Sequence, residues 1–295
     1  MSLDRVINIL VTITLIEMMV FVGLRVKFAE LAQTAGNWRL LARAAVANYL
    51  LVPAVTVALL MLFHVGAMVA AGFLVLAVCP GAPYGPPFAA IARTNVPVAV
   101  GLMAMLAATS TIISPALLHV LLPWVSGGEA PHIDLVRMLG ALLVTQLLPL
   151  LLGIVVRHRR PQVADRLLAP LELVSKMLNL GVAGLILGTQ FRMLAEIPVA
   201  GFAGMLMLLV ASLAIGWLAG GPERDDRRTM ALTTSLRNVG LGLVVVTGHF
   251  AGTPAVSAAL AYGIVEVLGS LVAALWWARQ MGRLTPTTFE QGSRS

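Results

Sequence analysis

The sequence predicts an all-α membrane protein with nine transmembrane helices, two of them broken, from its composition, the length of its apolar runs and its distribution of charge. Hydrophobic residues make up 59% of the 295 residues and charged residues only 11%, which is too little polar surface for a soluble domain. The apolar runs do not alternate as the strands of a membrane barrel do. Because a bilayer offers its interior no water, such runs must cross it as helices of about 20 residues.

Nine apolar segments follow one another along the chain, each long enough to cross a bilayer. They are 6–24, 42–63, 67–92, 96–125, 136–156, 171–191, 200–219, 230–249 and 254–278. The third and fourth segments are separated only by Arg93, Thr94 and Asn95, so the count needs an independent check.

The positions of Lys and Arg provide that check. If the N-terminus lies outside, the cytoplasmic regions are the C-terminal tail and the loops after segments one, three, five and seven. Fifteen of the 20 basic residues fall there: Arg25, Lys27, Arg39, Arg43, Arg93, Arg157, Arg159, Arg160, Arg166, Arg224, Arg227, Arg228, Arg279, Arg283 and Arg294. This asymmetry predicts a multi-pass protein of the cell (inner) membrane with its N-terminus outside and a disordered cytoplasmic tail, 285–295.

The same composition argues against other classes of protein. Orientation in the membrane explains the net charge of +7, so we expect no nucleic-acid partner. The single cysteine, Cys79, excludes an intramolecular disulfide, and no two of the five histidines have ligand spacing on one helix face. The sequence therefore predicts neither a metal site nor an enzyme, and no cleavable signal peptide is evident.

The third segment is interrupted at mid-depth by Cys79-Pro80-Gly81-Ala82-Pro83-Tyr84-Gly85-Pro86-Pro87. Its four prolines remove four backbone donors and disfavour helical geometry in each preceding residue. Unwound backbone at this depth is tolerated only where it is buried in protein or lines an aqueous cavity. A kinked helix repaired by its neighbours is the alternative, but this density of proline favours an open break that forms a site.

The eighth segment is interrupted by Thr233-Thr234-Ser235-Leu236-Arg237-Asn238-Val239-Gly240-Leu241-Gly242. An arginine at the centre of a transmembrane helix costs about 2.5–3.5 kcal/mol on insertion scales. Arg237 follows Arg227 and Arg228 by about ten residues, or about 14 Å of helix, which is too deep for easy snorkelling to the surface. Interruptions at corresponding places in the two halves indicate an inverted-repeat secondary transporter whose site lies between them.

These residues resemble the bile acid:sodium symporter family. The matching stretches are VFVGL at 20–24, ANYLLVP at 47–53, CPG at 79–81, ARTNV at 92–96, STIISPA at 110–116, SLRNVGL at 235–241 and GS at 269–270. The resemblance implies one transporter domain, 1–284, with a panel of 6–24, 136–156 and 171–191 and a core of 42–125 and 200–278. It implies alternating access by movement of core against panel. The family commonly has ten spans, so we expect the first to be missing here.

Several positions that bind sodium in the family differ in this chain. When the Cys-Pro-Gly turns are aligned, the family's Ser-Asn pair falls on Gly85 and Pro86. The hydroxyl ligands of the next span fall on Ala99 and Met103. None of these four residues offers a side-chain oxygen.

Three further family positions carry different polar or charged residues in this chain. A family glutamine falls on Asn48, the shared glutamate falls on Thr233 and a second glutamine falls on Arg237. The asparagine that the family uses at its substrate cavity is retained as Asn238. We expect the Arg237 guanidinium to replace the charge of a bound cation.

Our hypothesis is a sodium-independent carrier of a small organic anion, such as a monocarboxylate, a sulfonate or a sterol-like acid. We expect no cofactor, and the sequence alone leaves the coupling ion, Na⁺ or H⁺, undetermined. The candidate substrate-binding residues are Arg237, Asn238, Thr233, Thr234, Tyr84, Gly85 and Pro86. The candidates for ion coupling are Asn48, Thr233 and Glu266. Glu266 lies deep in the last segment, where it either pairs with Arg237 or carries a proton.

Three other functions stay open at this point. Arsenite and other metalloid efflux carriers have a related architecture and use a cysteine near the first broken helix, although the Cys-Pro-Gly order here resembles the bile acid branch. A sodium-coupled symporter with altered ion ligands and a channel built from the same halves are the other two. The sequence leaves substrate identity, direction of transport and oligomeric state undetermined.

Overall fold

The computed structural model describes residues 3–127, 134–195 and 199–283, and in these ranges every regular element is a helix. The predicted tail, 285–295, lies outside the described residues. In chain order the elements are α1 (Leu3–Arg25), α2 (Phe28–Gly36), α3 (Trp38–Val46), η1 (Ala47–Leu51), α4 (Val52–Leu62), α5 (Ala67–Ala77), α6 (Gly85–Ile91), α7 (Val96–Ser126), α8 (Leu135–Leu142), η2 (Leu143–Leu147), α9 (Leu148–Arg159), α10 (Pro161–Ala195), α11 (Val199–Ala219), α12 (Arg224–Ser235), α13 (Val239–His249) and α14 (Pro254–Arg283).

Eight stretches within the described residues are apolar and long enough to cross a bilayer. They are 5–25, 38–62, 96–126, 135–159, 161–189, 199–219, 224–249 and 254–280, and each contains most of one predicted segment. The remaining predicted segment, 67–92, is divided between α5 and α6, and α5 is an apolar helix of only 11 residues. The chain is therefore a multi-pass helical membrane protein.

Several helices extend beyond the predicted segments. Residues 157–170 were expected to form a loop, but α9 continues to Arg159 and α10 begins at Pro161. Likewise α3 begins at Trp38 and α12 at Arg224, and α2 occupies part of the predicted first loop. Hydropathy finds only the part of a helix that lies in hydrocarbon, so charged helix ends are assigned to loops.

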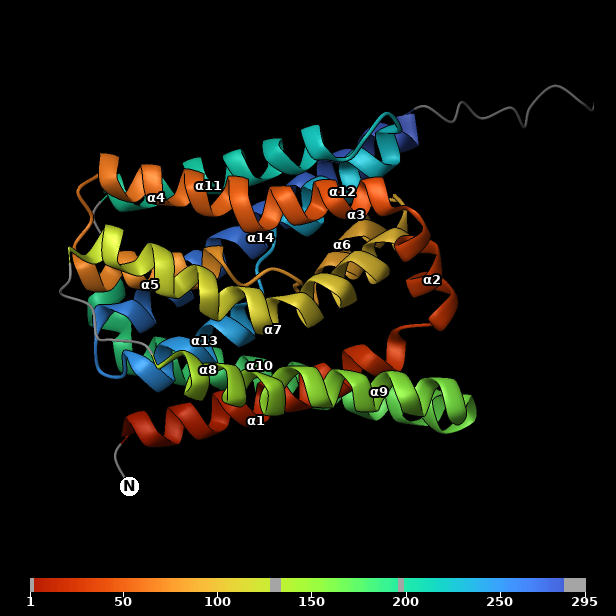
Figure 1. Cartoon of the computed structure of the whole chain (residues 1–295), viewed down its shortest axis with the longest axis horizontal. Coiled ribbons are helices and arrows are strands. Elements are labelled where there is room, and N and C mark those ends of the chain that lie inside the picture. The colour runs from red at the N-terminus through yellow and green to blue at the C-terminus, as the bar shows by residue number, and fades with distance from the viewer. Residues whose placement is uncertain (1–2, 128–133, 196–198, 284–295) are drawn as a thin grey trace, which may run out of the picture.

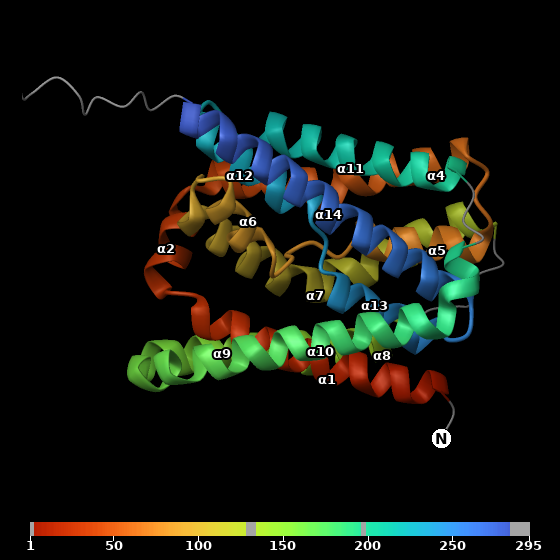
Figure 2. The same cartoon turned by 180° about the vertical axis from the view of Figure 1, so that it is seen from behind.

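The helices form layers that Figures 1 and 2 show from opposite sides. Helices α1, α8, α9 and α10 lie along one side, and α3, α4 and α11 lie along the opposite side. Between them lie α5, α6, α7, α13 and α14. Gly23 and Gly153 bring α1 and α9 into backbone contact, because a Cβ on either glycine would lie within 2.4 Å of the other helix's backbone.

Two helices contain a π-turn that ends just before a proline. Residues 47–51 form η1 before Pro53, and residues 143–147 form η2 before Pro149. The wider turn accommodates a proline that has no N–H to donate. Each π-turn carries one fully buried amide side chain, Asn48 or Gln146, so both amides are placed inside the molecule.

Candidate functional site

The first break consists of the backbone between the end of α5 at Ala77 and the start of α6 at Gly85. Gly81 has a φ of 88°, and a Cβ there would lie 2.4 Å from the backbone nitrogen of Ala107 in α7. Only glycine fits this conformation and this close approach. Gly85 and Pro86, predicted to be unwound, instead form the first turn of α6, where a missing N–H is tolerated.

The second break is shorter and separates α12 from α13 at residues 236–238. Leu236 is extended, and Asn238 starts α13 by accepting the Leu241 N–H on its side-chain oxygen at 3.1 Å. This is an N-cap contact, which satisfies one of the free donors at a helix start. The break is narrower than predicted, because Thr233, Thr234 and Ser235 belong to α12 and Gly240 belongs to α13.

The two breaks touch at the centre of the molecule, where Figures 1 and 2 show both irregular connections. The Asn238 N–H donates to the Cys79 carbonyl oxygen at 2.8 Å, so one break supplies a backbone partner for the other. Beside this bond, a Cβ on Gly85 would lie 3.3 Å from the Thr233 methyl group. The structure therefore brings the predicted residues of both halves together.

Arg237 is completely buried at this crossing. Its guanidinium donates to the Thr234 carbonyl at 2.6 Å and, more weakly, to the Ala77 carbonyl at 3.4 Å. These carbonyls belong to the last turns of α12 and α5, where helix dipoles place partial negative charge. The guanidinium therefore lies between two half-helix ends, a position suited to a cation.

Glu266 of α14 is also completely buried, and it contacts the backbone of Arg237. Its Oε1 accepts the Arg237 N–H at 2.8 Å, while Oε2 has no hydrogen-bond partner among the described residues. The described ion pairs do not include one between the two side chains. The predicted pairing of Glu266 with Arg237 therefore exists through the backbone and not through the guanidinium.

Unpartnered polar atoms gather around the second break. Within the described chain, the buried side-chain atoms without a partner include Asn48 Oδ1, Arg237 Nε, Asn238 Nδ2 and Glu266 Oε2. Buried polar groups in folded proteins are nearly always paired, so a group of exceptions marks a place suited to binding a polar ligand. The Asn238 Nδ2 donor, at the N-terminus of α13, is suited to an anion.

A family model described as the sodium bile acid symporter family matches residues 12–216. The chain belongs to this family. The matched range contains the first break and ends before the second. This membership and the apolar helices together make the chain a multi-pass membrane protein of a transporter family.

Two curated proteins are each 25% identical to this chain over the residues that align. The probable sodium/metabolite cotransporter BASS2, chloroplastic, of Oryza sativa subsp. japonica aligns over 279 residues, 91% of this chain and 64% of the rice protein. The uncharacterized sodium-dependent transporter YocS of Bacillus subtilis (strain 168) aligns over 241 residues, 78% of this chain and 71% of its own length. This chain thus spans less than two thirds of the rice protein.

Of the positions that the resemblance aligns with family sodium ligands, only Thr233 and Asn48 carry a side-chain oxygen, and Asn48 Oδ1 has no partner among the described residues. The Thr233 hydroxyl donates to carbonyls of its own helix, at Thr229 and Met230, and its methyl faces Gly85. Asn48 is buried, and its Nδ2 donates to the Ala44 carbonyl and the Thr234 hydroxyl.

The remaining predicted site residues lie at the edge of the crossing. Tyr84 immediately precedes α6 and packs near Phe88, with ring centroids 6.4 Å apart. Thr234 accepts a hydrogen bond from Asn48 through its hydroxyl at 3.3 Å and from Arg237 through its carbonyl. Pro86 is buried in α6, so its ring is part of the packing.

Gln146 is a buried polar residue that the sequence reasoning missed. Its Nε2 donates to the Ala107 carbonyl and to the hydroxyls of Ser110 and Thr111, at 2.9 and 3.3 Å respectively. The contact ties η2 to α7 near the first break, where Ser114 donates to the Val78 carbonyl at 2.5 Å. The STIISPA stretch at 110–116 could have indicated such a partner, because its hydroxyl groups need hydrogen-bond partners inside a membrane span.

Other polar residues form contacts away from the crossing. Glu17 of α1 accepts the Ser175 hydroxyl of α10 at 2.7 Å, and Lys176 pairs with Glu172 on an exposed helix surface at 2.8 Å. Within the described ranges, no group of three His, Cys, Asp or Glu side chains is arranged to hold a metal ion.

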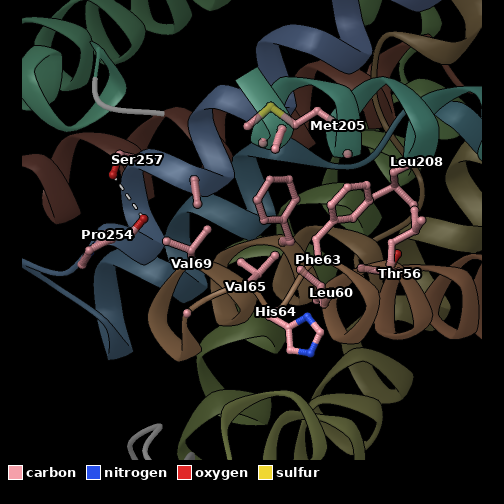
Figure 3. Close-up of a pocket in the computed structure, with 17 residues that line it drawn as sticks. Thr56, Leu60, Phe63, His64, Val65, Val69, Met205, Leu208, Pro254 and Ser257 are labelled. Atoms are coloured by element: carbon pink, nitrogen blue, oxygen red, sulfur yellow. Dashed lines mark hydrogen bonds between the residues drawn. The ribbon is translucent and has the colours of Figure 1, made fainter. Parts of the chain in front are cut away.

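A separate apolar cavity of about 430 Å³ lies between α4, α5, α11 and α14. Figure 3 shows side chains such as Phe63, Val69 and Met205 around it, with the Ser257 hydroxyl donating to the Pro254 carbonyl at 3.1 Å. None of the predicted substrate-binding residues lines this cavity. It is therefore distinct from the crossing of the two breaks.

Proposed function

We propose that this protein is a secondary active transporter of small organic anions that works by alternating access without sodium. One observation carries the proposal: the buried Arg237 guanidinium bridges the carbonyl ends of α5 and α12. In transporters with broken helices, such carbonyl ends commonly hold the coupling cation. A covalently attached guanidinium supplies that positive charge permanently, because arginine stays protonated in proteins.

The neighbouring contacts support the same conclusion. A sodium ion needs several oxygen ligands, yet Gly85 and Pro86 bring no side-chain oxygen, and Thr233 and Asn48 bring one each. Both curated relatives carry names that include sodium, so transport without sodium would set this chain apart from them.

The anion site in this proposal lies at the start of α13. Asn238 offers an unpartnered, fully buried Nδ2, and the N-terminus of α13 attracts negative charge. Gly240 faces α1, because a Cβ there would lie 3.4 Å from Leu15. The anion would therefore bind between the second break and α1, with Arg237 providing the field rather than a direct contact.

The layers seen in the fold suit this mechanism. We assign α1, α8–η2–α9 and α10 to the panel, and the segments 38–126 and 199–280 to the core. We also assign α5 and α6 together to one crossing, which gives nine crossings with the N-terminus outside and the C-terminus in the cytoplasm, as two inverted repeats. Movement of core against panel would expose the α13 site to each side in turn.

Replacing external sodium by choline tests sodium independence. Protein reconstituted into liposomes should take up labelled short-chain monocarboxylates or alkylsulfonates at the same rate in both salts. A collapse of uptake in choline would overturn the proposal and favour a sodium-coupled symporter with altered ligands.

Thermal-shift screening of the same anions tests the role of Arg237. The Arg237→Gln variant restores the family residue, so its fold should survive, but removing a buried charge should weaken anion binding by roughly tenfold or more. Arg228→Gln is the matched control, because Arg228 is also buried but lies near the start of α12, 3.7 Å from Asp225. Equal binding by all three proteins would show that Arg237 is not the anchor.

A metalloid efflux carrier is the second candidate, because Cys79 lies inside the first break. Its thiol is completely buried and is the chain's only cysteine, so a multi-thiol site cannot form. Arsenite resistance that depends on Cys79, measured with a Cys79→Ser variant, would favour this candidate over the organic-anion carrier.

A further inference from the structure

The interior around the second break contains one basic and one acidic side chain. Among the described residues, the buried charged side chains are Arg228, Arg237 and Glu266, and Arg228 has Asp225 as its partner. Arg237 and Glu266 are both completely buried and are joined through the Arg237 backbone N–H. These two residues therefore set the charge of the core interior.

The elements packed against Glu266 contribute few other titratable groups. Helices α5, α6 and α11 contain none, and α13 contains only His249, at its last residue. The charges of α12 are confined to 224–228, and the charged side chains of α10 with described exposure are exposed. Tyr262 lies one turn before Glu266, and the other ionisable groups close to Arg237 are Cys79 and Tyr49.

The contacts of Glu266 leave one oxygen open to a proton. Oε1 accepts the Arg237 N–H, whereas Oε2 is buried without a donor, and the guanidinium donates to carbonyls instead. An ionised carboxylate oxygen without a donor is unfavourable in a protein interior. A proton on Oε2 would remove this charge without disturbing the bond at Oε1.

We propose that Glu266 is the proton-binding site of a proton–anion symport, an inference that rests on the proposed anion transport. The empty core contains the Arg237 cation and the Glu266 anion and is neutral. The loaded core contains the Arg237 cation, protonated Glu266 and one bound monoanion, and is neutral again. A core with only the proton or only the anion carries a net charge, which a membrane-embedded core disfavours.

The charge count requires the proton and the anion to cross together, and it sets the net charge that crosses the membrane. The proton joins Oε2 on the side where the anion binds, and it leaves Oε2 on the other side as the anion dissociates. One proton and one monoanion cross together, so transport of a monoanion is electroneutral. A symporter that moves extra sodium ions with each monoanion would instead respond to membrane potential.

Anion binding by purified protein tests this coupling. The probe is the alkylsulfonate that gives the largest thermal shift in the screen above, because a sulfonate stays ionised from mildly acidic to mildly alkaline pH. Where Glu266 is ionised in the empty protein, the Kd should rise by about tenfold for each pH unit. In Glu266→Gln this slope should vanish, whereas Glu17→Gln, a control at a glutamate of α1 that contacts Ser175, should keep it.

Proton uptake by the wild type provides a measurement that needs no variant. Adding the same alkylsulfonate to weakly buffered protein should bind one proton per anion, reported by an indicator dye. In liposomes, an inward proton gradient should drive accumulation, and a valinomycin-imposed potassium potential should not. Glu266→Gln should lose net accumulation and retain anion exchange.

The outcomes separate the two proposals. Anion binding that depends on Arg237 but takes up no proton, or keeps its pH slope in Glu266→Gln, overturns the proton coupling and leaves the anion carrier intact. Uptake that responds to the potential and not to the proton gradient overturns it as well. If no monocarboxylate or alkylsulfonate binds at all, both proposals fall.

Discussion

The two breaks interrupt their helices by different physical means. In the first break, Pro80 and Pro83 have no N–H to donate and Gly81 adopts a left-handed conformation, so the chain itself cannot continue the helix. In the second break the backbone donors remain, and they find partners elsewhere. The N–H groups of Arg237 and Asn238 donate to Glu266 and Cys79.

This difference shows which residues determine each break. The first break is encoded in its own residues and presents no charged side chain. The second break is stabilised by α14 and by the first break, and it contains the buried arginine. One break thus supplies rigid backbone and the other supplies charge, and their stabilities should respond differently to substitution.

The largest expected effect comes from Gly81→Ala. Ala at a φ of 88° is strained, and its Cβ would meet the Ala107 backbone at 2.4 Å, so the variant should lose about 2–5 kcal/mol of unfolding free energy. Thermal unfolding in detergent, followed by tryptophan fluorescence, would measure the loss. Gly127→Ala is the matched control, because Gly127 has a φ of 57° with open space around it and should lose only about 1 kcal/mol. Equal losses would mean that the backbone contact between break and α7 is unimportant.

The sequence predicted the first break better than the second for the same reason. Proline and glycine act locally, so Pro80, Gly81 and Pro83 could be interpreted without knowing any neighbour. The partners of Arg237 could not be predicted, because they depend on how α5, α12 and α14 pack. Glu266 was a candidate only because a buried acid needs an explanation.

Three features of the structure could not be predicted from hydropathy or from the helix-breaking tendency of proline. Hydropathy predicted the apolar segments but not the charged ends of the helices. The spacing of apolar residues could not predict the π-turns that bury Asn48 and Gln146. Gly85 and Pro86 were expected to be unwound because proline breaks helices, yet at a helix start it is well tolerated.

A smaller effect is expected when the first break loses its link to α7. Ser114→Ala removes the hydroxyl that donates to the Val78 carbonyl and leaves a buried acceptor, so it should cost about 1–2 kcal/mol. Because this break carries no charge, the loss should be the same with and without a bound anion. Thr56→Val is the control, since its hydroxyl bonds only the Val52 carbonyl of the same helix, and it should be nearly neutral. A loss that changes on adding anion would place the first break in the binding site.

The smallest effect distinguishes two asparagines with the same backbone conformation. Asn95 has φ −77° and ψ 84°, Asn238 has φ −75° and ψ 82°, and each caps the helix that follows it. Replacing either by Ala should cost about 1 kcal/mol of unfolding free energy, measured by thermal unfolding in detergent. Their amide nitrogens differ, because Asn95 Nδ2 donates to Asp226 at 3.0 Å whereas Asn238 Nδ2 has no partner.

Anion affinity should therefore separate the two variants where stability does not. Asn238→Ala removes a donor that is free to bind the anion, so its Kd should rise roughly tenfold, the effect of one hydrogen bond. Asn95→Ala removes a donor already used by Asp226, so its Kd should match the wild type. If both variants kept the wild-type Kd, the spare donor at the second break would have no part in anion binding, and the site would have to lie elsewhere along α13.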